Sequence, residues 1–234
     1  MTVAYDNFSN GTAGTGDISW THTPVGTPRA VIVFIAGIAG ADEVSGVTYG
    51  GTAMTEMTGS PSSKATGETG TVYGYFLGAS IPTGAQTVAM TSTAANLKSI
   101  CAITLTGAAD TEIVDVDATI SSDAVADPSV TLSLASRDSF CAIGLYSGQD
   151  AVTGITPLTG WTSRLEQDAG TEVVGYYTYD TVGSTDVTAG WTQTSEDAIA
   201  IAVAVSEVAG GDPEGRLLAG KLIGGGLLLK GVLT

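Results

Sequence analysis

A single histidine limits the acid–base chemistry that this chain could perform. A serine or cysteine nucleophile needs a histidine beside it as general base. His22 lies in the alternating segment Ile18–Thr23, which places it on one strand face with Ile18 and Trp20. We therefore expect His22 to pack at a strand end rather than to act as a base, which would need an orienting partner.

The two cysteines, Cys101 and Cys141, occur in similar contexts, Ser-Ile-Cys-Ala-Ile and Ser-Phe-Cys-Ala-Ile. Two cysteines and one histidine fit no standard zinc spacing, which excludes a Cys/His zinc site. Both sequences are typical of buried strands, so we expect free, buried thiols in a reducing compartment rather than a disulfide.

Carboxylates are numerous enough that a glycosidase pair is not excluded by counting. Asp115 and Asp117 are two residues apart and would share one side of a strand, where a solvated face is the simpler explanation. Calcium is the alternative for these residues or for a loop with Asp123 and Asp127, although no EF-hand pattern is present. A phosphate-binding Gly-rich loop with lysine is also absent from the sequence. We predict a protein that is not an enzyme and has no cofactor.

Four aromatic residues near the end of the chain have two explanations. A sandwich that binds glycans often exposes such rings, whereas core packing would bury them. Tyr177 and Tyr179 share one strand face by alternation, with Tyr176 on the other. The candidate glycan-binding residues are Trp161, Tyr177, Tyr179 and Trp191.

The elements that would position these residues are short apolar or alternating runs separated by turn residues, and 32 residues are glycine. This spacing predicts an all-β fold, an antiparallel two-sheet sandwich of jelly-roll type over residues 1–208, with no clear internal repeat. Gly50-Gly51 predicts a tight hairpin. The expected strands are Asp17–Thr23, Ala30–Ala36, Val44–Tyr49, Ala53–Thr58, Thr71–Gly78, Gln86–Thr91, Ser99–Thr106, Glu112–Ala118, Ser129–Ala135, Ser139–Ser147, Thr162–Gln167, Val173–Asp180, Val187–Gln193 and Ala198–Glu207.

The last of these runs alternates Ile or Val with Ala between Ala198 and Val203. We expect its large face to fill the core between the two sheets. The Ala face would allow a loop or a neighbouring subunit to approach closely.

Charge is divided unevenly along the chain. Residues 216–234 contain three basic residues and no acidic one, which gives this segment a charge of +3. Because the net charge of the whole chain is −16, residues 1–215 carry a charge of −19. Such an acidic body repels nucleic-acid phosphate and anionic membranes and disfavours nonspecific packing of copies. We therefore expect neither nucleic acid nor membrane as a partner.

A boundary falls at residues 209–215, where Gly and Pro end the last strand pattern. Two lysines and a Gly triplet interrupt the following 19 residues, which makes a transmembrane helix a poor explanation. Ten of the 19 are Leu, Ile, Val or Ala, which would be a liability if left exposed. We predict that residues 216–234 form an extended anchor that packs on a partner. Its anchoring side chains are Leu217, Leu218, Leu222, Ile223, Leu227, Leu228, Leu229 and Leu233.

Four segments resemble the β-sandwich domains of bacteriophage and prophage virion proteins, and the resemblance covers about residues 15–208. They are Ile18–Val33, Val47–Met54, Tyr75–Leu77 with Ile81–Val88, and Asp197–Val205. Such proteins are head decorations, spikes, fibres and tail-associated adhesins, so the resemblance implies a structural role and carries no catalytic residues.

The resemblance implies a virion protein made in the host cytoplasm, which agrees with a start that shows no signal-peptide pattern. The expected partners are other virion proteins (capsid, portal or tail) and copies of the chain itself, with a trimer as one arrangement. A receptor- or glycan-binding adhesin on the tail is the alternative function.

Overall fold

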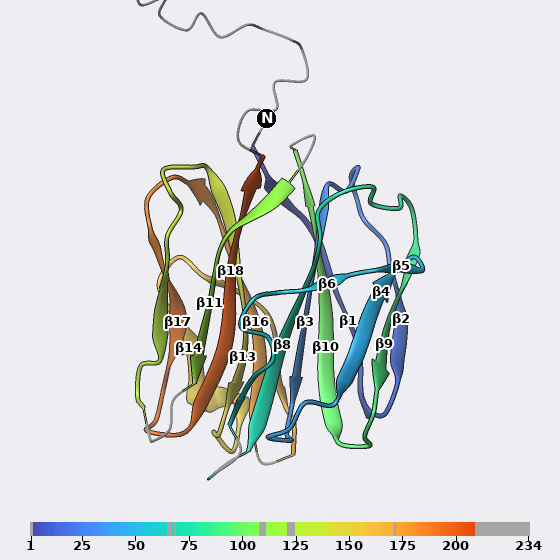
Figure 1. Cartoon of the computed structure of the whole chain (residues 1–234). Helices are drawn as coiled ribbons and strands as arrows, with labels where there is room; N and C mark the ends of the chain where they lie inside the picture. Colours follow the sequence, from blue (N-terminus) through green and yellow to red (C-terminus); the bar gives the residue numbers. More distant parts are fainter. Residues whose placement is uncertain are drawn as a thin grey trace, which may run out of the picture.

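The computed structural model describes residues 2–64, 67, 69–107, 111–120, 125–170 and 172–208, and almost all of its regular structure is β-strand. The first half of the chain forms two antiparallel sheets (Figure 1). Its strands are β1 (Ala4–Thr15), β2 (Ile18–His22), β3 (Ala30–Gly37), β4 (Val44–Tyr49), β5 (Thr52–Ala53), β6 (Thr55–Glu56), β7 (Ser62–Lys64), β8 (Gly70–Leu77), β9 (Gln86–Ser92) and β10 (Leu97–Thr106).

These strands have the connectivity of a jelly roll, in which the chain alternates between two sheets. The large sheet has the order β1-β10-β3-β8-β6, with β7 also paired to β8, and the small sheet has the order β2-β9-β4-β5. First and last strands thus pair in one sheet, and second and second-last in the other. The tight β4–β5 turn depends on Gly50 and Gly51, whose φ values are 56° and 79°, as the Gly-Gly hairpin predicted.

The second half repeats this topology. The large sheet has the order β11-β18-β13-β16-β15, and the small sheet has the order β12-β17-β14. Its elements are β11 (Thr111–Ile120), β12 (Ser129–Leu132), β13 (Ser139–Ser147), a 3-10 turn η1 (Val152–Gly154), β14 (Ile155–Pro157), β15 (Thr162–Asp168), β16 (Val173–Gly183), β17 (Val187–Gln193) and β18 (Ala198–Glu207). The expected all-β, jelly-roll-type fold is confirmed, and residues 1–208 hold two such sandwiches.

The two halves also have short similar sequences in their small sheets. Thr87-Val88-Ala89-Met90-Thr91 of β9 corresponds to Thr188-Ala189-Gly190-Trp191-Thr192 of β17, and Ser19-Trp20-Thr21 of β2 corresponds to Ser129-Val130-Thr131 of β12. The pairing is equivalent as well, because Thr21 lies opposite Thr87 and Thr131 opposite Thr188. The two similar cysteine segments, in contrast, occupy β10 and β13, which are not equivalent strands.

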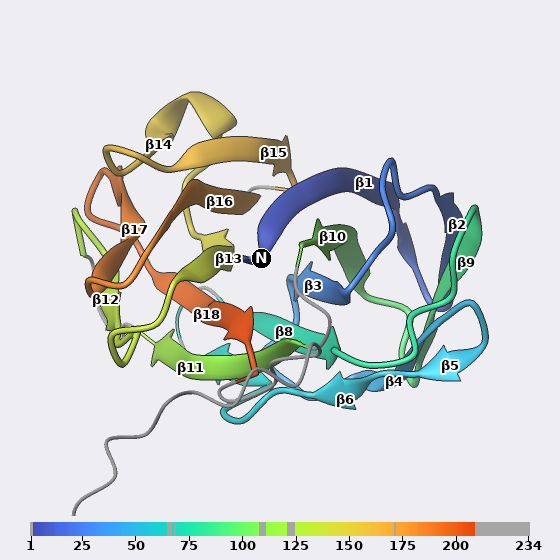
Figure 2. The same cartoon turned by 90° about the horizontal axis from the view of Figure 1, so that it is seen from above.

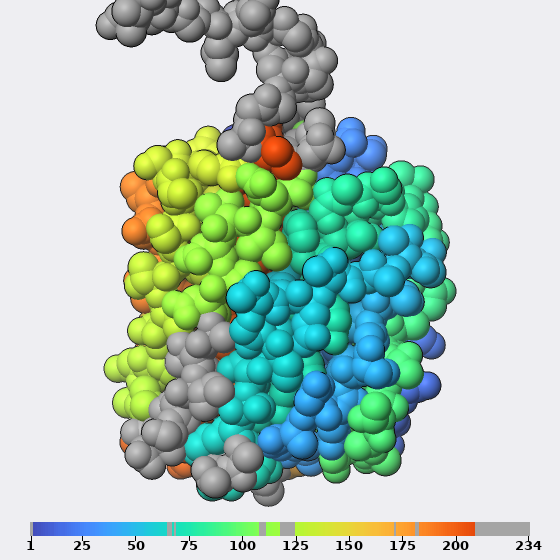
Figure 3. Space-filling view, in the orientation of Figure 1, coloured from blue at the N-terminus to red at the C-terminus, as the bar shows by residue number. Residues whose placement is uncertain are grey.

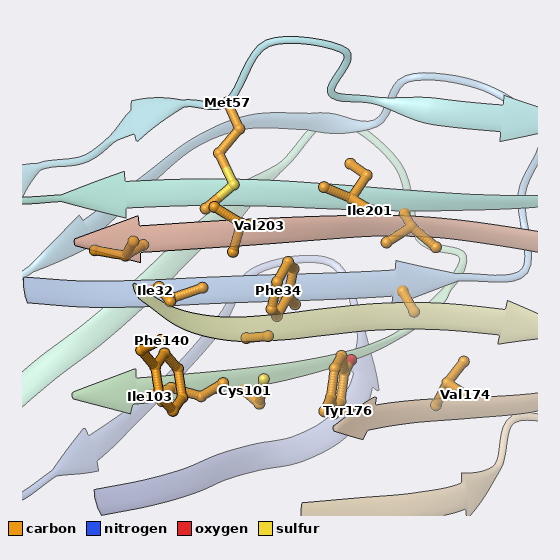
Figure 4. Packing of buried hydrophobic residues seen from close by; sticks show 14 of the residues in the cluster. Ile32, Phe34, Met57, Cys101, Ile103, Phe140, Val174, Tyr176, Ile201 and Val203 are labelled. Carbon is orange, nitrogen blue, oxygen red and sulfur yellow. The ribbon is translucent and has the colours of Figure 1, made fainter. Parts of the chain in front are cut away.

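Three hydrophobic cores separate four sheet layers (Figure 2). One core fills the first sandwich and includes Tyr73 and Met90, and another fills the second and includes Ile143 and Trp191. The third lies between the two large sheets, where residues such as Phe34 and Ile201 from different halves share one cluster (Figure 4). The small sheets are therefore the outer layers, on opposite sides of the molecule.

The central core is close-packed around Phe34 and Gly144. The Phe34 ring stacks on that of Tyr176 with centroids 6.5 Å apart, and a Cβ at Gly144 would lie 2.7 Å from Cγ of Phe34. At the edges, Arg164 of β15 lies over the ring of Tyr5 in β1, and a buried ion pair joins Lys64 to Asp197. Figure 3 shows the two halves in continuous contact on one face.

The expected strands differ from the observed ones in a few places. β1, β7 and β14 were not expected, and the segment at 53–58 divides into β5 and β6. β1 was not predicted because its sequence contains Asn and Gly and does not alternate apolar and polar residues. Its pairing with β10 has register shifts between Tyr5 and Asn7 and between Gly11 and Gly14, which break the regular alternation of side chains. The Ala face of β18 is covered by the core of its own sandwich, which includes both Trp161 and Trp191.

Candidate functional site

The predicted anchor residues all lie outside the described part of the chain. They are Leu217, Leu218, Leu222, Ile223, Leu227, Leu228, Leu229 and Leu233. What the structure does describe is the end of the last strand. β18 ends at Glu207, opposite Thr111 at the start of β11, at the end of the molecule where β1 begins (Figure 1).

The last strand is held at this point by Arg137. Its guanidinium forms an ion pair with Glu112 at the start of β11 and donates to the carbonyl oxygen of Glu207. A surface hollow of about 330 Å³ lies beside this contact, lined by Thr2, Ser136, Arg137, Asp138, Ser184 and Glu207. Segments far apart in the sequence thus meet at the end of β18, and the spacing of Arg137 and Glu112 in the sequence gives no indication of this contact.

The aromatic candidates are placed mainly in the core of the second sandwich. Trp161, Tyr177 and Trp191 are buried, and both indoles have partners within the fold. Trp161 Nε1 donates to the carbonyl oxygen of Thr188 at 2.9 Å, and Trp191 Nε1 donates to Gln193 Oε1 at 2.7 Å. These three rings pack the sandwich and do not form the exposed platform that a glycan-binding surface requires.

Tyr179 differs, because it is only partly buried. Its ring lies 5.6 Å from that of Trp161 and borders a surface hollow of about 220 Å³, together with Thr159, Asp186 and Thr188. One carboxylate oxygen of Asp186 already accepts the Leu134 N–H at 3.1 Å. The hollow thus offers the Tyr179 side chain, a few hydroxyl groups and the Asp186 carboxylate.

His22 lies in a continuous hydrogen-bonded chain in the first sandwich. Trp20 Nε1 donates to Ser9 Oγ at 2.9 Å, and Ser9 Oγ lies 2.7 Å from His22 Nδ1. His22 Nε2 lies 3.1 Å from Thr104 Oγ1, which donates to Asp6 Oδ2 at 2.8 Å. If Nε2 carries the proton of the neutral ring, every donor in this series of hydrogen bonds points toward the Asp6 carboxylate.

The hydrogen bonds around His22 occupy its imidazole within the fold. His22 is buried, and its burial lowers its pKa to about 4, an effect that nearby Asp6 partly opposes. Both ring nitrogens are occupied, so the imidazole has no free position for a substrate proton. The predicted packing role holds, with hydrogen bonds that the sequence did not reveal because Thr104 is 82 residues away.

Asp115 also has a structural contact. Its Oδ2 accepts the N–H of Ser133 at 2.7 Å, which ties β11 to the segment that follows β12. A β-bulge between Ile113 and Asp115 interrupts the pairing of β11 with β18. Within the described ranges, no three His, Cys, Asp or Glu side chains gather into a group that could hold a metal ion.

The cysteines are free and buried, as expected. Cys101 lies in the central core and Cys141 in the core of the second sandwich. Burial raises the pKa of the Cys141 thiol to about 12 and raises that of Cys101 as well, so both thiols stay protonated at neutral pH.

Comparison with protein-family models, with curated proteins and with solved structures finds no match to this chain. Among the described residues, no helix has the length and apolar character needed to cross a membrane.

Proposed function

We propose that this chain is a structural protein of a phage virion, with the paired jelly rolls as its exposed body and residues 216–234 as its anchor on the particle. The observation that carries the proposal is the contrast between body and tail. The body is acidic and packed, whereas the 19 residues at the end are basic and rich in Leu.

The surface of the body supports this division of roles. Among the described residues, Val25 is the one large hydrophobic side chain that is exposed. A body of this kind offers little apolar area for docking, so attachment through the Leu-rich tail is the simpler arrangement. The jelly roll is also a frequent architecture of viral capsid domains, although it serves lectins and enzymes too.

The burial of Trp161, Tyr177 and Trp191 weakens the adhesin alternative, because these rings were its proposed glycan contacts. His22 has hydrogen-bond partners at both ring nitrogens and both thiols are buried, so neither a histidine base nor a cysteine nucleophile is available to a substrate. A scaffold role therefore accounts for more of the described side chains than an enzymatic one.

The proposal is tested by altering the chemistry of the tail while keeping its length. The variant Leu227→Ser, Leu228→Ser, Leu229→Ser removes apolar anchoring groups, and the variant Lys221→Glu, Lys230→Glu reverses the charge. Each is expressed with the other structural proteins of its phage, and its content in purified particles is measured. We expect the serine variant to be lost from particles and the glutamate variant to be depleted, most strongly at low salt. Normal incorporation of both would overturn the proposal.

A further inference from the structure

The two outer sheets carry no charged residue in any of their strands. This holds for β2, β4, β5 and β9 on one side and for β12, β14 and β17 on the other. The chain has 24 acidic and eight basic residues, and its large sheets do carry some, such as Asp6, Lys98 and Glu166. Charge is therefore missing from two particular surfaces of an acidic body.

The residues that face outward on these sheets are small or hydroxyl-bearing and repeat between the halves. Thr21 beside Thr87 on the first sheet is matched by Thr131 beside Thr188 on the second, and all four are exposed. The neighbouring row continues with small side chains, since Ser19 lies opposite Ala89 and Ser129 opposite Gly190. We call these the two Thr faces. Figure 2 shows them on opposite sides of the molecule.

We infer that the Thr faces are contact surfaces between copies of this chain. Copies with a body charge of −19 repel one another wherever carboxylates approach, so a close contact is favoured where neither surface carries charge. A highly charged partner would find no counter-charge on these faces, whereas a second Thr face is uncharged and matched in side-chain size.

Small Thr, Ser, Ala and Gly side chains on the Thr faces allow two such sheets to approach closely face to face. Because each molecule has two Thr faces on opposite sides, the contact can extend beyond a dimer. This association uses no part of the tail and does not depend on the virion role.

Ionic strength provides a distinctive signature. Asp17 and Asp42 border the first Thr face, and Asp127 and Asp186 border the second. These carboxylates repel when two faces approach, and salt screens the repulsion. Association through the Thr faces therefore becomes stronger as the salt concentration rises. Docking of the basic tail on an acidic surface becomes weaker, because salt screens the attraction.

Analytical ultracentrifugation of the full chain tests the inference. We expect mass above that of one chain as concentration rises, with more association in 0.5 M than in 0.05 M NaCl. The double variant Thr87→Glu, Thr188→Glu places a carboxylate on each face and is expected to remain monomeric. The control Thr162→Glu alters an exposed residue of β15 and is expected to associate as the wild type does. Circular dichroism checks that all variants fold.

A wild-type chain that stays monomeric at all concentrations and salt levels would overturn the inference. So would association that the double variant leaves unchanged, or association that weakens with salt. Each of these results is independent of incorporation into particles, so the tail proposal and the Thr-face contact can fail separately.

Discussion

At the scale of single residues, the ring of His22 is held by hydroxyl groups on both sides and has no exposed surface. The hydrogen bonds that run from Trp20 through Ser9, His22 and Thr104 to Asp6 link β1, β2 and β10. Asp6 also accepts the N–H of Gly26 at 2.7 Å. Burial keeps the imidazole neutral. Protonation of His22 would make both ring nitrogens donors, so the Ser9 hydroxyl could no longer donate to Nδ1. A lower pH therefore destabilises the folded state at this position.

The first prediction concerns pH. The pKa of His22 is about 4 in the folded chain and near 6.5 when unfolded, so the unfolded state binds more protons between these values. Stability therefore falls as pH decreases through this window. We expect the free energy of unfolding to be about 1–2 kcal/mol lower at pH 5 than at pH 7 from this residue. Urea titrations of wild type and His22→Gln measure it. An equal change in both would contradict the assignment.

The second prediction concerns Thr104, which is buried between His22 and Asp6. Thr104→Val keeps the shape but removes the hydroxyl that serves both groups. We expect a loss of about 1–3 kcal/mol in urea denaturation, because buried polar groups lose their partner. Thr131→Val, at an exposed position of β12, is the control and should change little.

At the scale of elements, β18 separates two cores with one alternating sequence. Ile201 and Val203 face the central core, whereas Ala200 and Ala202 face the core of the second sandwich. The small residues on the second side share that core with large side chains, among them Trp191 and Ile143. The alternation in the sequence predicted the two unequal faces, but the partner of the Ala face could not be inferred from β18 alone.

The third prediction tests this packing. Ala202→Leu introduces volume into a filled core and is expected to lower the free energy of unfolding by about 1–3 kcal/mol. Ala53→Leu, at an exposed position of β5, provides the matched control and should be nearly neutral. Thermal unfolding followed by circular dichroism measures both. Equal stability of the two variants would show that the space beside Ala202 is not filled.

Much of the fold could be predicted from the sequence because most strands have an apolar face or a fully apolar run. Segments such as Ala30–Gly37 and Ala198–Glu207 are buried on both faces and were recognised. β1 was missed because its polar, Gly-containing sequence lacks that pattern. The repeated topology was missed because the similar sequences of the two halves are short, as in Thr87–Thr91 and Thr188–Thr192. Contacts such as Arg137 with Glu112 depend on the tertiary structure.

At the scale of the whole molecule, the two jelly rolls share a hydrophobic core. Phe34 of the first half stacks on Tyr176 of the second, and Gly144 leaves room for the Phe34 ring. Separating the halves would expose this core to water. We therefore expect them to unfold as one cooperative unit.

The fourth prediction follows from the placement of the tryptophans. Trp20 lies in the first half, whereas Trp161 and Trp191 lie in the second. The variant Trp20→Phe reports on the second half by fluorescence, and the variant Trp161→Phe, Trp191→Phe reports on the first. In each variant, fluorescence and circular dichroism should give coincident urea transitions. A fluorescence transition displaced from that of the whole chain would show that the halves unfold independently.

The most direct test of the structural role is a competition between the full chain and residues 1–210, produced together in equal amounts with the other virion proteins. The shorter chain keeps every described strand, so it is expected to fold. Mass spectrometry of purified particles measures the ratio of the two forms. We predict particles that contain the full chain and almost none of the shorter form. Equal amounts of both in the particles would contradict anchoring by the tail.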